Sequence, residues 1–233
     1  MKFYSLTCTR GGPLSDTTTN LLEYFKKCSV ESKLLVDKPS IFTAYDEGLD
    51  EIDADFDDII ILCHDDIQIL TDPKLFTSIL KENLSKRNAG FVGVAGASIF
   101  TKSGVWWEQE IWDKGGLTGQ AMHGKLSEND LTHFGPYREA VVLDGVFLAT
   151  TKRVLRSLQL KKPRSFTGDW DFYDIFYTFQ AHIKGKVNAT IPINICHESR
   201  GELVGRDSWY QNKDAFVKKF STYLPAQIKR RKP

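Results

Sequence analysis

The feature that most constrains the fold is a run of five apolar residues, Ile59-Ile60-Ile61-Leu62-Cys63, which ends abruptly in His64-Asp65-Asp66. A continuous apolar run of this length is typical of a strand that is covered on both faces. Helices must then pack on either side of the sheet that contains it. Segments with strand character alternate along the chain with segments of helical character. The pattern therefore predicts an α/β fold with a mostly parallel central sheet flanked by helices.

Local patterns predict the other elements. Further strands are expected over residues 3–8, 33–37, 90–96, 140–143 and 186–195. Helices are expected after the capping residues Ser15, Ser40 and Asp72, and over residues 152–158, 171–183 and 209–220. Residues 101–137, rich in Gly, Trp and His, are expected to form a long functional loop region with an embedded hairpin. Neither of the two commonest Gly-rich phosphate-binding motifs occurs.

Length and composition indicate one globular domain. The chain has 233 residues, 41% hydrophobic and 26% charged, which is ordinary for a globular protein with a substantial core. Because there is no internal repeat or clear linker, we place a single domain over residues 1–220 and a basic tail over 221–233. The basic run Lys229-Arg230-Arg231-Lys232 is either a solvated chain end or a weak contact to an anionic membrane surface.

Charge and cysteine content limit the class of partner and the compartment. A net charge of +1 gives no electrostatic argument for binding nucleic acid. The four cysteines, Cys8, Cys28, Cys63 and Cys196, show neither a CxxC pair nor zinc-ribbon spacing, so we expect reduced thiols and a cytoplasmic location. The sequence turns polar too early for a signal peptide. It also contains no apolar stretch near the roughly 18 residues of a transmembrane segment.

A metal site is predicted where the strand of residues 59–63 ends. Ligands of open α/β sheets bind beyond the carboxyl ends of the strands, where Asp65 and Asp66 lie. Two adjacent carboxylates are costly to hold together unless a cation pairs them, and Mn²⁺ or Mg²⁺ also bridges phosphate oxygens. The structural alternative is that the two acids cap the following turn or the helix at Pro73.

His197 strengthens the metal hypothesis. It also follows a predicted strand, so it is expected at the same sheet edge as Asp66. A single histidine is more commonly a satisfied structural residue. The polar segment His197-Glu198-Ser199-Arg200-Gly201, however, is typical of a ligand-binding loop.

An aromatic cluster and an acidic cluster are the other candidate sites. Trp106, Trp107 and Trp112 offer ring faces that stack on sugars or bases, with core packing as the alternative. Asp171 and Asp174 are three residues apart and would share a helical face. A carboxylate in apolar surroundings has a raised pKa, which suits a general base, although an N-cap is the alternative for Asp171.

Asp144 follows the predicted strand of residues 140–143 and is a further candidate, for holding a sugar hydroxyl. The alternative is that the Asp144-Gly145 pair forms a tight turn.

The ordered set of motifs resembles the GT-A glycosyltransferases related to family 2, especially the StrF-like subgroup. The residues that carry the resemblance span almost the whole chain. They are Ala44 to Gly48, Ile59 to Ile67, Gly93 to Gly96, Trp106-Trp107, Asp144 to Ala149, Phe172 to Ile175 and His197 to Gly201. Four positions depart from the family pattern: Asp46, His64, Tyr173 and Phe176.

The resemblance implies a metal-dependent transferase that uses a nucleotide-sugar donor, with UDP favoured, and inverts the anomeric carbon. Asp174 would act as general base, with Asp171 as the alternative, and Asp66 and His197 would be metal ligands. The remaining site residues are Thr7, Asp37, His64 and Asp65 for the donor nucleotide and Trp106, Trp107 and Asp144 for the substrate. The competing hypotheses are a metal-dependent hydrolase or nucleotidyltransferase and a non-catalytic carbohydrate-binding module.

Overall fold

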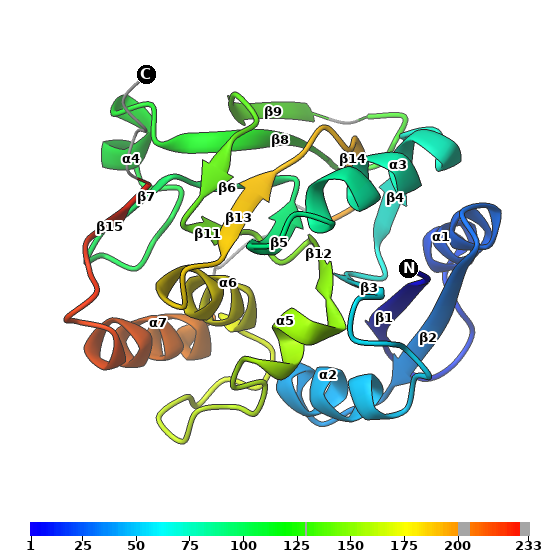
Figure 1. Cartoon of the computed structure of the whole chain (residues 1–233), viewed down its shortest axis with the longest axis horizontal. Helices are drawn as coiled ribbons and strands as arrows, with labels where there is room; N and C mark the ends of the chain where they lie inside the picture. The colour runs from blue at the N-terminus through cyan, green and yellow to red at the C-terminus, as the bar shows by residue number, and fades with distance from the viewer. Residues whose placement is uncertain (129, 200–205, 229–233) are drawn as a thin grey trace.

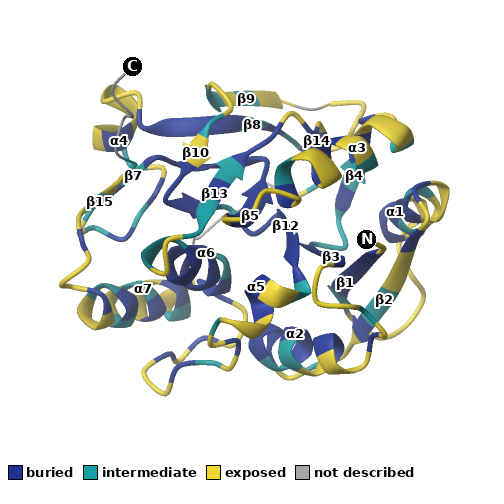
Figure 2. Ribbon diagram, viewed as in Figure 1, coloured by how far each residue is buried: buried dark blue, intermediate teal, exposed yellow. Residues whose placement is uncertain are grey.

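The apolar run forms strand β3 (Ile59–Cys63), and all five of its residues are buried at the centre of the molecule. The computed structural model describes residues 1–128, 130–199 and 206–228 (Figure 1). β3 belongs to a seven-stranded sheet with the following order: β10 (Glu139–Ala140), β13 (Val187–Thr190), β5 (Ala89–Gly93), β12 (Phe147–Thr151), β3, β1 (Phe3–Thr9) and β2 (Val30–Val36). The central strands β3, β12 and β5 appear dark blue in Figure 2, whereas the edge strand β2 and the outer helices carry exposed residues.

The strand directions confirm the predicted α/β class. β1 runs parallel to both β2 and β3, as expected for the first half of the chain. β12 is antiparallel to both β3 and β5, whereas β13 is parallel to β5. The sheet is therefore mixed, with parallel pairs among β1, β2 and β3 from the first half of the chain and a further parallel pair between β5 and β13.

Helices cover both faces of the sheet. α1 (Asp16–Lys27) and α3 (Pro73–Leu84) lie together, with the rings of Phe25 and Phe76 6.5 Å apart. α2 (Ile41–Asp50) and α6 (Tyr173–Ile183) lie together as well, with Phe42 and Phe176 6.4 Å apart. The three predicted caps, Ser15, Ser40 and Asp72, each accept a backbone hydrogen bond. The shorter α4 (Gln109–Asp113) and α5 (Lys152–Arg156) and the late α7 (Asp207–Lys219) complete the layer.

A second sheet carries much of the later chain. Its order is β11 (Val142–Leu143), β6 (Ala95–Ala97), β8 (Leu117–His123), β14 (Ile195–His197) and β4 (Ile67–Ile69). β9 (Asp130–Gly135) pairs with β8 and forms the hairpin expected within residues 101–137.

Three predicted strands each divide between the two sheets. Residues 90–96 form β5 and β6, residues 140–143 contribute to β10 and β11, and residues 186–195 contribute to β13 and β14. The prediction of single strands was wrong because the backbone leaves one sheet and enters the other within each segment. In the last of them Pro192, which has no N–H to donate, lies between the two strands.

The end of the described chain is paired with the body of the molecule. β15 (Ala226–Gln227) pairs with β7 (Ile99–Phe100), and the Ile228 N–H donates to the Ser98 carbonyl at 2.9 Å. Part of the segment predicted as a tail is therefore held in place. The basic run at residues 229–232 lies outside the described residues.

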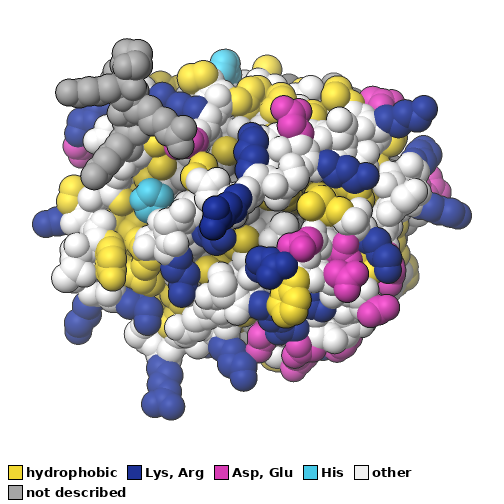
Figure 3. Space-filling view, viewed as in Figure 1, with side chains coloured by type: hydrophobic (Ala, Val, Ile, Leu, Met, Phe, Trp, Pro, Cys, Tyr) yellow, Lys and Arg dark blue, Asp and Glu magenta, His cyan; other side chains and the backbone are white. Residues whose placement is uncertain are grey.

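Charged side chains are dispersed over one face of the molecule (Figure 3). Lys and Arg side chains are spread over the face seen in Figure 3, with Asp and Glu side chains gathered mainly at its lower right. This arrangement differs from the continuous basic stripe typical of nucleic-acid-binding proteins. All four cysteines are free thiols, as expected. None of the described helices is long and apolar enough to cross a membrane.

Asn188 links three parts of the core, and its loss should be costly. Its Oδ1 accepts from the Phe91 N–H at 2.9 Å, and its Nδ2 donates to the carbonyls of Val141 (3.1 Å) and Thr178 (2.8 Å). Asn188→Ala leaves three buried backbone groups without these partners, so we expect unfolding free energy to fall by about 2–4 kcal/mol in urea denaturation. The exposed Asn20→Ala in α1 should change it by less than about 0.5 kcal/mol.

Candidate active site

The turn after β3 joins the two sheets and brings distant residues together. The chain passes from β3 through residues 64–66 into β4, which pairs antiparallel with β14 so that Ile67 faces His197. The Glu198 N–H donates to the Asp66 carbonyl at 3.0 Å, and the His64 N–H donates to the Val146 carbonyl at 3.2 Å. Strand pairing therefore places His197 beside the segment that follows the central strand, at the sheet edge where the sequence predicted it.

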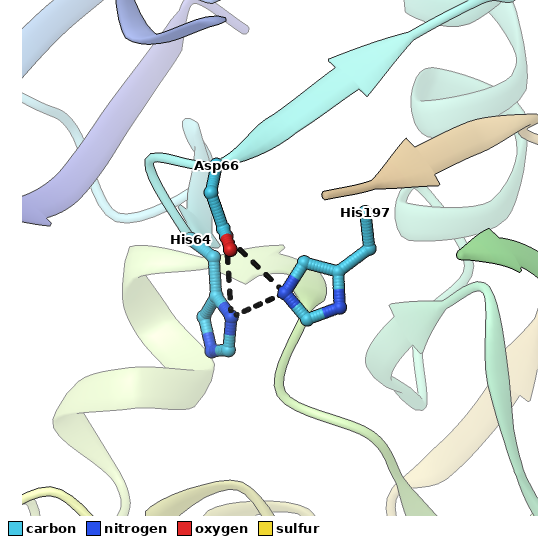
Figure 4. Close-up of side chains that lie close together, drawn as sticks. All are labelled: His64, Asp66 and His197. Atoms are coloured by element: carbon cyan, nitrogen blue, oxygen red, sulfur yellow. Dashed lines mark hydrogen bonds and ion pairs between the residues drawn. The ribbon is translucent and has the colours of Figure 1, made fainter. Parts of the chain in front are cut away.

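His64, Asp66 and His197 form a compact cluster, with side chains that point toward one another (Figure 4). His197 Nε2 lies 3.2 Å from Asp66 Oδ1 and 3.3 Å from His64 Nδ1, and His64 Nδ1 lies 3.8 Å from Asp66 Oδ1. Metal–ligand bonds of about 2.0–2.2 Å place neighbouring ligand atoms about 3 Å apart. The three atoms are therefore spaced as ligands of a single ion.

Hydrogen bonding fixes how His64 presents its ring. The Tyr173 hydroxyl donates its one proton to the Gly145 carbonyl at 2.9 Å, so it must accept from His64 Nε2, which lies 3.2 Å away. His64 Nδ1 then carries a lone pair that faces Asp66 and His197. Burial, together with neighbouring His197, lowers the pKa of His64 and keeps this ring neutral.

The donor set fits a divalent transition metal. Although burial opposes ionisation, the hydrogen bond and charge of His197 hold the pKa of Asp66 at about 2, so this carboxylate is ionised at neutral pH. The cluster thus offers one carboxylate and two imidazoles. Imidazole nitrogen is a poor ligand for Mg²⁺, which prefers oxygen, so of the two predicted ions the residues favour Mn²⁺.

Removal of the Tyr173 hydroxyl should weaken metal binding. In Tyr173→Phe, His64 loses the partner that fixes its tautomer, and loss of such a partner typically lowers metal affinity by about 10–100-fold. Calorimetric titration with Mn²⁺ measures the effect. Tyr177→Phe is the matched control, because this buried hydroxyl donates to the Leu160 carbonyl at 2.7 Å and does not contact His64. Equal Mn²⁺ affinity in both variants would contradict the assigned tautomer.

Two cavities meet at the cluster. The first has a volume of about 740 Å³ and lies over the ends of β1 and β2 and the start of α2. The second has a volume of about 430 Å³ and lies between the second sheet, α4, α6 and α7. His64, Trp170 and Tyr173 line both. A ligand in either cavity therefore lies beside the candidate metal site.

Three of the residues predicted for donor binding line the first cavity: Asp37, His64 and Asp65. Asp37 has a positive φ of 48° and accepts from the Gly11 N–H at 2.7 Å, which positions its carboxylate at the cavity wall. Thr7 is the fourth residue predicted for donor binding. Its buried side chain turns toward β3, where Oγ1 lies 3.4 Å from Cys63 Sγ, and it lines neither cavity.

Asp174 and Asp144, two acids that line the second cavity, each accept a hydrogen bond from a backbone N–H. Asp174 Oδ2 accepts from the Gly145 N–H at 2.8 Å, and Asp144 Oδ1 accepts from the Val146 N–H at 2.9 Å, as in the tight-turn alternative. Burial, followed by the charge of nearby Asp144, raises the pKa of Asp174 to about 7. Asp174 is thus close to half-ionised at neutral pH, as a general base requires.

The carboxylate of Asp171 makes structural contacts with its neighbours. α6 begins at Tyr173, so Asp171 precedes the helix and the predicted shared face with Asp174 is wrong. Its buried carboxylate pairs with Arg206 through Oδ1 and accepts from Ser208 Oγ at 2.5 Å through Oδ2. Both oxygens therefore anchor the start of α7, which leaves Asp174 as the better candidate base.

Several lining residues were missed by sequence reasoning. Tyr173 and Trp170 line both cavities, and Arg10 and Lys38 place cations in the first. Lys38 follows the turn at the end of β2, a position that sheet-edge reasoning could have indicated. The contact of Tyr173 with His64 had no local signal. Arg200 and Gly201 of the predicted ligand loop lie outside the described residues.

Comparisons with known proteins identify the family. A family model for glycosyltransferase-like proteins matches residues 16–220. Curated proteins give no match to the sequence. Among solved structures, the chain resembles GalNAc-T7 with UDP, GalNAc and Mn²⁺, at 9% identity and a TM-score of 0.55, over 94% of this chain and 48% of that chain. It therefore spans about half of that protein.

Two further structures have TM-scores below 0.5. The protein A197 from STIV is 11% identical over 84% of this chain and 85% of its own, with a TM-score of 0.47. A putative glucose-1-phosphate thymidylyltransferase from Bacillus anthracis, in complex with sucrose, is 9% identical over 94% of this chain and 96% of its own, with a TM-score of 0.46. Because the family model covers most of the sequence, the chain belongs to the glycosyltransferase-like family, and its fold is of the GT-A type.

Proposed function

We propose that the protein transfers a sugar from a nucleotide-diphosphate donor, preferably a UDP-sugar, to a hydroxyl of a glycan or glycoconjugate, with a divalent metal and inversion of configuration. The observation that carries this proposal is the His64, Asp66 and His197 cluster at the junction of two cavities. A transferase with two substrates needs two adjoining sites, with the bond to be broken between them. Within the family we assign the chain to the StrF-like subgroup.

The first cavity suits the donor. Its walls carry the cations Arg10 and Lys38, which attract a diphosphate, and the carboxylate of Asp37, which can accept hydrogen bonds from ribose or base. His64, Asp66 and His197 would hold the metal. A bound divalent ion neutralises charge on the diphosphate leaving group. GalNAc-T7, which shares the fold, was solved with UDP and Mn²⁺, and this favours the same pair here.

The second cavity suits the acceptor. Asp174 lies there beside Asp144, at the side of the cluster away from Asp37. In a direct displacement Asp174 removes the proton of the acceptor hydroxyl as that oxygen attacks the anomeric carbon, and its raised pKa supports this role. We propose that this chemistry takes place in the cytoplasm, where four free thiols are stable.

Calorimetric titration tests the proposed function. UDP, GDP, CMP and dTDP are each titrated with and without Mn²⁺, and we expect metal-dependent binding of one nucleotide, preferably UDP. Binding of no nucleotide would overturn the glycosyltransferase proposal. Incubation of the matching sugar nucleotide with and without acceptor then separates sugar transfer from simple hydrolysis or from synthesis of the sugar nucleotide.

A further inference from the structure

All five tryptophans of the chain line the second cavity. The five come from segments far apart in the sequence: Trp106 and Trp107 before α4, Trp112 in α4, Trp170 before α6, and Trp209 in α7. Tryptophan is the largest side chain, and a fold that only needed core volume would distribute such residues through its interior. Their gathering around one cavity beside the metal cluster indicates a ligand rather than packing alone.

The aromatic rings contact one another in T-shaped or tilted arrangements. Trp112 contacts Phe134 with ring centroids 6.2 Å apart, and Phe134 contacts Trp106 at 5.4 Å. Trp106 in turn contacts Trp107 at 5.4 Å, and Trp107 contacts Trp209 at 5.4 Å. These contacts connect the segment before α4, α4 itself, β9 and α7. The aromatic lining of the cavity is therefore largely formed before a ligand binds.

Exposure divides the tryptophans into an inner and an outer set. Trp106 and Trp209 are 3% and 7% exposed and pack against the other aromatic rings of the cavity. Trp107, Trp112 and Trp170 are 38%, 45% and 42% exposed, although burial of such rings is strongly favourable. Open aromatic faces beside a cavity mark a binding surface, because they lose their contact with water only when a ligand covers them.

The polar groups of the cavity narrow the ligand class. The carboxylates of Asp144 and Asp174 line it and offer hydrogen-bond acceptors, since each carboxylate has several acceptor lone pairs beyond those used by the Val146 and Gly145 N–H groups. A sugar ring matches this arrangement, since it presents hydroxyl donors along its edge and an apolar C–H surface on its face.

We infer that the cavity of the five tryptophans binds the acceptor as an uncharged saccharide, whose ring face lies on Trp107 or Trp112 and whose hydroxyls donate to Asp144 and Asp174. This assignment rests on the proposed transferase function, and it excludes two other acceptor classes. Asp144 and the partly ionised Asp174 repel an anionic acceptor such as a phosphate or a uronic acid, because the cation Arg206 in the same lining is already ion-paired. A purely apolar acceptor would remove water from both carboxylates and offer no hydrogen-bond donor in its place, which is costly.

Intrinsic tryptophan fluorescence provides a direct test that needs no donor. The protein is titrated with methyl glycosides of glucose, galactose, mannose and N-acetylglucosamine, with lactose and maltose, and with glucuronate and octyl phosphate as charged probes. We expect a saturable change in emission with at least one uncharged saccharide. The affinity should fall about tenfold or more in Trp107→Ala or Trp112→Ala, which remove a stacking face. Tyr223→Ala, an exposed aromatic that lines neither cavity, should leave it unchanged.

Calorimetry with UDP and Mn²⁺ on the same variants separates this inference from the proposed function. Retained nucleotide binding in Trp107→Ala and Trp112→Ala would show that the donor site is intact and would support the assignment of the tryptophans to the acceptor. Nucleotide binding without any saccharide response, or a response to glucuronate or octyl phosphate alone, would overturn the saccharide inference and leave the transferase proposal standing. A saccharide response in a protein that binds no nucleotide would overturn the transferase proposal instead.

Discussion

Asp174→Asn should lower kcat by about 10²–10⁴-fold, the range that a general base typically contributes. The substitution keeps the shape of the side chain and removes its ability to accept the acceptor proton. Asp174 can take that proton near pH 7 because burial, with the charge of Asp144, raises its pKa to about 7. The binding constants of nucleotide and Mn²⁺ should change little, because Asp174 belongs to the second cavity and not to the metal cluster.

The pH profile gives the same assignment a second readout. A base with a pKa of about 7 must be ionised to act, so kcat should rise about tenfold per pH unit below pH 7 and level off above it. Asp144→Asn removes the like charge beside Asp174. The pKa of Asp174 then falls, and the acidic limb of the remaining activity should move to lower pH.

A neighbouring acid provides the control for Asp174→Asn. Asp169 lies five residues earlier, lines neither cavity and pairs on the surface with Lys162 at 2.6 Å. Asp169→Asn is the same chemical change and should leave kcat within about twofold, since exposed ion pairs contribute little. Full transferase activity in Asp174→Asn would remove the base assignment and direct attention to Asp144.

The sequence predicted best those elements whose signals are local. The apolar run of β3 and the caps Ser15, Ser40 and Asp72 gave the central strand and three helices, because burial on both faces and N-terminal capping depend on residues within a few positions. The placement of Asp66 and His197 at one sheet edge followed from a general rule about strand ends. That rule does not predict distances, so the close spacing of these two residues with His64 is known only from the structure.

The sequence could not predict contacts that depend on tertiary pairing. The carboxylate of Asp171 is ion-paired with Arg206, a residue 35 positions away. No local sequence pattern distinguishes Asp171 from Asp174. The strands that cross between sheets, such as β5 and β6, have the same apolar character on both sides of the crossing at Val94. The convergence of Trp209 with Trp107 likewise requires α7 to pack beside the loop of residues 101–108, which periodicity does not reveal.

Asp66→Ala should abolish metal-dependent nucleotide binding. Asp66 is the carboxylate of the cluster, and its ionised oxygen lies within 3.8 Å of the candidate nitrogen ligands of both histidines. Without it, only two imidazoles remain to hold a divalent ion, with no negative charge to balance it, and a hard ion such as Mn²⁺ is then bound poorly. We expect Mn²⁺ affinity to fall by more than about 100-fold in calorimetric titration.

Asp65→Ala separates loss of a ligand from loss of charge near the site. Asp65 is the adjacent residue and lines the donor cavity, but it is not a member of the three-residue cluster. Its removal should leave Mn²⁺ affinity within a few-fold, because the half-buried Asp65 does not ligate the ion and its charge is partly screened by water. If Asp65→Ala and Asp66→Ala lose Mn²⁺ equally, the ion is held by general negative charge rather than by the cluster. If Asp66→Ala keeps both Mn²⁺ and nucleotide binding, the metal site is elsewhere and the donor must be positioned by the cations of the first cavity, Arg10 and Lys38.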